Sequence, residues 1–71
     1  MYRAYDVKIR KEDRKKADEI LWKHWTNGDI DGITVNEGRS INGVETIVYW
    51  IRPYIYKDLE TIMDEFKQAG I

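Results

Sequence analysis

The sequence predicts a small α+β domain in which two helices pack on one face of a three-stranded sheet. Three observations predict this class: an unbroken apolar run from Ile47 to Ile51, an Asn42-Gly43 dipeptide between strand-like segments, and two segments with helical periodicity. The element order is then β-α-β-β-α, and we expect residues 1–71 to form a single domain.

The central strand is predicted over residues 44–52. Most of its residues are β-branched or aromatic, and no polar residue interrupts the run from Ile47 to Ile51. A strand with one wet face alternates apolar and polar residues, so this run indicates a strand that is covered on both faces. Pro53 ends the strand, because its nitrogen cannot donate to a sheet ladder.

The first strand is predicted over residues 2–10, where Tyr5, Val7 and Ile9 alternate with charged residues. This period of two is typical of a strand with one buried face. A charged segment follows it, and Asp13 is the predicted N-cap of the first helix.

Both helices are predicted from apolar stripes at helical spacing. In the first helix the stripe consists of Ala17, Ile20, Leu21 and His24, with Trp25 at its edge and Trp22 away from its centre. The Asn27-Gly28 dipeptide ends that helix. The second helix follows Pro53 and ends near Gly70, and its stripe consists of Ile55, Leu59, Ile62, Met63 and Phe66.

The second strand is predicted over residues 33–36, and its register against the central strand has two solutions. A two-residue loop at Asn42-Gly43 pairs Val35 with Trp50, which places the apolar residues of the second strand on the face of Trp50. If the helix-covered face is instead that of Tyr49, one extra residue must be inserted, and Gly38 is the natural place for such a β-bulge. The sequence leaves both registers open.

The central strand lies between the other two, which gives the sheet order 1-3-2. This topology resembles a ferredoxin-like fold that lacks its fourth strand; the resemblance covers the whole chain but no sequence motif supports it. It makes the first strand an open edge. Because the central strand is apolar on both faces, we also expect apolar side chains on the open face of the sheet.

Composition argues against several function classes. Twelve basic residues against thirteen acidic ones give a net charge of −1, and the chain has no cysteine and a single histidine. We therefore expect no metal, no cofactor and no enzymatic activity, with His24 as a half-buried packing residue. No apolar segment approaches the length of a membrane span and no signal-peptide pattern is present, so we expect a cytoplasmic protein.

The function that we expect is a protein–protein interaction module that acts through its sheet edge or its open sheet face and forms a homodimer. Such a small adaptor or inhibitor-like domain would suit a phage or a mobile element. The residues expected to carry protein binding are Tyr5, Lys8, Arg10, Trp22, Trp25, Tyr49, Trp50 and Arg52.

Two alternatives remain open. The first is binding of single-stranded RNA or DNA on the sheet, with bases stacked on aromatic side chains. The residues expected to carry it are Arg3, Lys8, Arg10, Arg39, Tyr49 and Arg52. The second is an enzyme with its site at a dimer interface.

Overall fold

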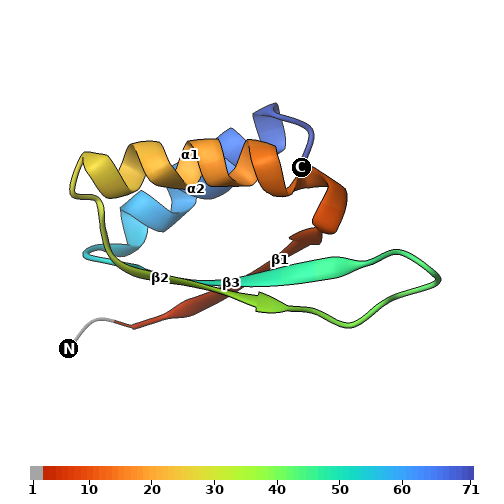
Figure 1. Cartoon of the computed structure of the whole chain (residues 1–71). Coiled ribbons are helices and arrows are strands. Elements are labelled where there is room, and N and C mark those ends of the chain that lie inside the picture. Colours follow the sequence, from red (N-terminus) through yellow and green to blue (C-terminus); the bar gives the residue numbers. More distant parts are fainter. Residues whose placement is uncertain (1–2) are drawn as a thin grey trace.

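The computed structural model describes residues 3–71 (Figure 1). The elements, in chain order, are β1 (Tyr5–Arg10), a 3-10 turn (Lys11–Asp13), α1 (Arg14–Thr26), β2 (Ile30–Glu37), β3 (Thr46–Pro53) and α2 (Tyr56–Gln68). The order β-α-β-β-α is therefore confirmed.

The three strands form one antiparallel sheet of order β1-β3-β2, and both helices lie on the same side of it (Figure 1). Both features agree with the sequence-based prediction. The strand bounds differ: β2 begins at Ile30 and not at residue 33, because Ile30 is buried and pairs with Pro53. Pro53 is itself the last residue of β3, at a position where its missing N–H is tolerated. The part of the first predicted strand that lies at residues 1–2 falls outside the described residues.

Of the two registers that the sequence leaves open, the sheet adopts the one with an extra residue inserted near Gly38. Val35 lies opposite Tyr49, and the Gly38 N–H donates to the Thr46 carbonyl at 2.9 Å. Beyond that pair, Ile41 bridges Val44 around the turn, so residues 39–40 stand opposite Glu45 alone. The extra residue is thus inserted next to Gly38, as the second solution requires.

This register determines what each face of β3 carries. Ile47, Tyr49 and Ile51 are buried beneath the helices, whereas Val48 and Trp50 point to the open face. The neighbours of Val48 and Trp50 on that face are polar: Asp6, Lys8, Thr34 and Asn36. On the open face, which we expected to be apolar, Val48 and Trp50 are therefore flanked by polar side chains.

The helix termini agree with prediction in part. Gly28 and Gly70 follow the two helices with φ near +80°, the left-handed conformation that glycine adopts without strain. Asp13 is the residue before α1, but its side chain makes no capping hydrogen bond. Its carboxylate instead accepts from the Arg10 guanidinium at 3.2 Å.

Gly38→Ala should destabilise the protein, because a Cβ at this position would overlap Thr46 Oγ1 and lie 3.0 Å from the Thr46 carbonyl carbon. We expect a loss of about 1–3 kcal/mol in the free energy of unfolding, measured by urea denaturation. In a Thr46→Ala background, which lacks Oγ1, the loss should be smaller. An equal loss in both backgrounds would show that the overlap with Thr46 Oγ1 is not the cause.

Candidate functional site

Two exposed tryptophans lie on the flank of α1 that faces β2. Trp22 and Trp25 are three residues apart, so they share one side of the helix. Trp22 is 69% exposed and Trp25 is 44% exposed. Leu21 next to them is buried in the core, which fixes this part of the helix and with it the direction of both indoles.

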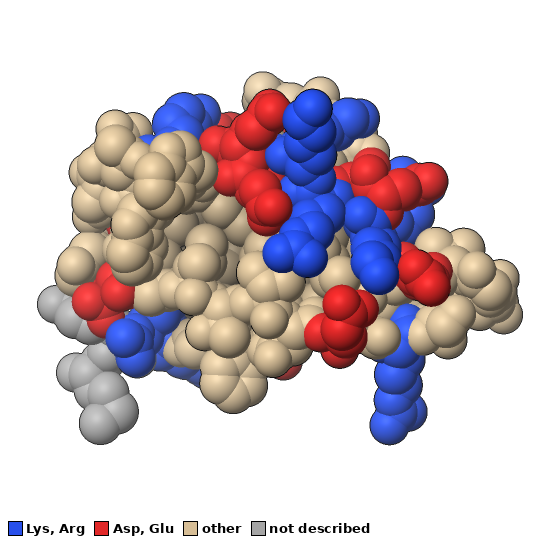
Figure 2. Space-filling view, in the orientation of Figure 1, with Lys and Arg blue, Asp and Glu red and all other residues tan. Residues whose placement is uncertain are grey.

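A groove separates this flank of α1 from β2, and we call it the α1–β2 groove. Its volume is about 1070 Å³. In Figure 2 the surface below the C-terminal half of α1 is recessed and uncharged, whereas charged side chains gather over the N-terminal half. The apolar lining comes from α1, β2 and β3, and consists of Leu21, Trp22, Trp25, Ile33, Val35 and Tyr49.

The groove exists because the helices cover the two edges of the sheet unequally. On β1, the inward side chains of Val7 and Ile9 are buried in the core cluster that also contains Phe66 of α2. On β2, the corresponding side chains of Ile33 and Val35 stay half-buried. Ile33 and Val35 of β2 are therefore more open than Val7 and Ile9 of β1.

β2 also presents unpaired backbone. Within residues 3–71, β3 is the only strand beside it. Backbone pairing alternates along an antiparallel strand, and the Gly38 N–H donates toward β3. The N–H and C=O groups of Ile33, Val35 and Glu37 therefore point away from the sheet, along the open side of the groove.

The rim of the groove near the start of α1 carries both signs of charge in equal number. Its members are Lys11, Glu12, Arg14, Lys15, Asp18 and Glu19. Arg14 pairs with Asp18 at 3.5 Å, and Lys11 lies 4.0 Å from Glu37 and 3.7 Å from Glu45. The groove therefore has no strong preference for an anion or a cation.

Tyr49 lies at the floor of the groove and is only 1% exposed. Its hydroxyl donates to Asp18 on α1. Burial, and then this carboxylate, raise the pKa of Tyr49 above its usual value. The prediction that Tyr49 serves as a surface anchor or a stacking platform is wrong, because the shifted register turns its ring under α1.

The other predicted binding residues do not form one surface with Trp22 and Trp25. Trp50 is 52% exposed on the open face. Val48, two residues before it on the same face of β3, lies opposite Lys8 of β1. Arg52 pairs with Asp31 at 2.8 Å. The remaining members of both predicted sets lie elsewhere: Tyr5 stacks edge-on with Tyr56 beneath Arg3, Arg10 pairs with Glu12 and Asp13, and Arg39 lies in the loop after β2.

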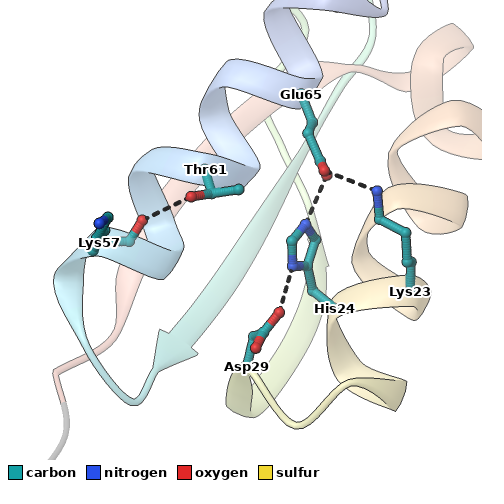
Figure 3. A network of polar contacts seen from close by, with 6 residues as sticks. All are labelled: Lys23, His24, Asp29, Lys57, Thr61 and Glu65. Atoms are coloured by element: carbon teal, nitrogen blue, oxygen red, sulfur yellow. Dashed lines mark hydrogen bonds and ion pairs between the residues drawn. The ribbon is translucent and has the colours of Figure 1, made fainter.

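A buried histidine lies between the two helices (Figure 3). His24 Nδ1 is 2.8 Å from Asp29 Oδ2, and its Nε2 is 2.7 Å from Glu65 Oε2. Lys23 Nζ donates to the other oxygen of Glu65 at 2.8 Å. A neutral imidazole has one N–H, so both ring nitrogens donate to carboxylates only in the imidazolium form.

The charges of this cluster support each other. Burial by itself lowers the pKa of His24, but the hydrogen bonds to Asp29 and Glu65 outweigh it and the pKa is raised. The Lys23 ammonium, together with His24, holds the pKa of Glu65 below its usual value. His24 is 5% exposed and both of its nitrogens are engaged, so it ties α1 to α2 and does not face a substrate.

The position of His24 agrees with the predicted packing role, but its two ion pairs have no counterpart in the prediction. Asp29 is five residues away in the sequence and Glu65 is 41 residues away. Neither spacing places two residues side by side within a helix or a strand, so only the fold brings these carboxylates to the ring.

In the described part of the chain, no three His, Asp or Glu side chains gather in a way that would hold a metal ion. Within the same residues, neither helix is long and apolar enough to cross a bilayer. Comparison with protein-family models, with curated proteins and with solved structures gave no match.

The His24 cluster predicts that stability falls as the pH rises. A raised pKa in the folded state means that the stabilisation is complete below the unfolded value of 6.5 and is lost as the pH rises through the folded value. We expect a lower thermal midpoint at about pH 9 than at about pH 6, a window below the titration of tyrosine. The change should be much smaller in His24→Gln, and an unchanged slope in that variant would contradict the assignment.

Proposed function

We propose that the chain is a protein-interaction module that binds polypeptide through the α1–β2 groove. The observation that carries the proposal is the combination, at one place, of two exposed tryptophans with half-buried Ile33 and Val35 and an unpaired strand edge. Tryptophan is among the residues that most often dominate binding energy, and exposed apolar surface next to a groove is typical of interaction sites.

The proposal moves the expected site from the first strand and the open face to β2. We propose that the arrangement is a ferredoxin-like fold without its fourth strand, in which β1 occupies the edge where that strand would pair. That edge carries Lys8 and Arg10, and Val7 and Ile9 on its inward side are buried, features that discourage strand addition. β2 also carries charged residues, Asp31 and Glu37, but its inward Ile33 and Val35 stay half-buried.

Nucleic-acid binding has less support than polypeptide binding. A stacking platform would rest on Trp50 alone, since Tyr49 is buried. Arg10 and Arg52, two of the cations expected to hold phosphates, are engaged with carboxylates. We also propose that the module acts without catalysis, because the one histidine is enclosed by its own ion pairs.

Selection from a random peptide library tests the proposed function. The protein is immobilised sparsely, so that neighbouring copies do not meet, and the enriched peptides are measured against two matched tryptophan variants. We expect binding to weaken about tenfold or more in Trp22→Ala, as for the loss of a binding anchor, and to stay unchanged in Trp50→Ala. Failure to enrich any peptide would contradict the proposal, as would peptides that depend on Trp50 and not on Trp22.

A single-stranded oligonucleotide at low salt tests the alternative. We expect no binding above background in a fluorescence anisotropy titration. Salt-dependent binding that is lost in both Lys8→Ala and Trp50→Ala would establish a nucleic-acid surface on the open face and would overturn the proposed function.

A further inference from the structure

We propose that the α1–β2 groove binds a second copy of this chain, through antiparallel pairing of the two β2 strands about a twofold axis at Val35. This rests on the proposed function, because it uses the same groove, and it names one partner for it. The result would be a continuous six-stranded sheet with four helices on one side.

The backbone of β2 fits its own copy. Its outward groups belong to Ile33, Val35 and Glu37, which are evenly spaced around Val35. In an antiparallel pair centred there, Val35 lies opposite Val35 of the second copy, and Ile33 lies opposite Glu37. All three residues then exchange their N–H and C=O groups, which closes the interface as an isologous dimer.

The side chains above the strands are complementary under the same operation. The two α1 helices lie on the same side of the joined sheet and run antiparallel. The C-terminal half of one helix, which carries Trp22 and Trp25, therefore faces the N-terminal half of the other, over which charged side chains gather in each copy (Figure 2). Because that rim has three cations and three anions, the copies do not repel, and Arg14 and Lys15 come near indole faces that attract cations.

A stable dimer on this side of the molecule must extend beyond the groove itself. A standard interface removes about 800 Å² from each partner. The accessible surface of this chain is 5162 Å², so such an interface takes roughly a sixth of it. The groove supplies only part of this area, so the outward edge of β2 and the exposed flank of α1 must supply the rest.

A second copy also covers all of the exposed apolar groups of the groove at once. Trp22, Trp25, Ile33 and Val35 lie on one side of the molecule. The twofold places Val35 against the partner's Val35, and it places Ile33 and the two tryptophans against the partner's Glu37 and the N-terminal half of its α1. A chain of this length buries a small core, so the added burial is a substantial gain in stability.

Mass in solution, from multi-angle light scattering over a concentration series, is the first part of the test. We expect a dimer that dissociates on dilution in the wild type and in Trp50→Ala. We expect a monomer in Trp22→Ala, whose exposed side chain is not needed for folding. We also expect a monomer in Val35→Pro, which removes an N–H that points away from β3 and leaves the pairing within the chain intact.

Amide hydrogen exchange, measured by NMR, identifies the strand that pairs. In the wild type at high concentration, the outward amides of Ile33, Val35 and Glu37 should exchange as slowly as the inward amides of Thr34 and Asn36. On dilution, or in Trp22→Ala, only the outward set should become fast. Circular dichroism checks that each variant is folded. If Val35→Pro does not fold, Trp22→Ala alone decides the test.

The outcomes separate this inference from the proposed function. A wild type that stays monomeric at all concentrations overturns the dimer, and the function still stands if selected peptides depend on Trp22. A dimer with fast outward β2 amides, or one that persists in Trp22→Ala, also overturns the inference, because the copies then meet elsewhere.

Discussion

The structure depends on the burial of one face of β3. Ile47, Tyr49 and Ile51 are almost fully enclosed, with β1 and β2 on either side and both helices above. A chain of 71 residues has few other places to build a core, so these three side chains fix which face of the sheet the helices cover. A slip of one residue would exchange them for Val48 and Trp50 and would break the contacts of both helices.

The unequal cover of the two sheet edges follows from the placement of the helices over that centre. Val7 and Ile9 of β1 are buried in the core cluster with Phe66 of α2, while Ile33 and Val35 of β2 stay half-buried. The His24 cluster holds the helices in this arrangement, since the ring, near the end of α1, pairs with Asp29 in the following loop and with Glu65 near the end of α2. The groove is thus a consequence of how the core is closed, and the exposed tryptophans of α1 lie where the cover is incomplete.

Much of the fold can be predicted from the sequence because it is encoded in local patterns. The apolar run of β3, the positive φ demanded at Asn42-Gly43 and the helical stripes are all short-range signals, and the order 1-3-2 follows from them. The register is different in kind. It depends on a single inserted residue next to Gly38, and the close approach of Thr46 that makes glycine necessary there is visible only in three dimensions.

The candidate site was predictable only in part, for the same reason. Trp22 and Trp25 stand out in the sequence as aromatic residues away from the centre of the helix stripe and at its edge, respectively, and they line the groove. The sequence does not determine which face of β3 the helices cover, so it allows Tyr49 to be predicted at the surface. The observed register places Tyr49 on the covered face, where it is buried. The half-open state of Ile33 and Val35 could not be foreseen, since it depends on how far α1 extends over β2.

The most direct measurement is paramagnetic relaxation of the side-chain NMR signals by a soluble gadolinium chelate, recorded on dilute protein. We expect strong broadening for Trp22, Trp25 and Trp50, and sharp signals for Ile47, Tyr49 and Ile51. Sharp signals from Val48 and Trp50 with broadened signals from Ile47 and Ile51 would mean that the other face of β3 is covered. That result would contradict the register, and the α1–β2 groove with it.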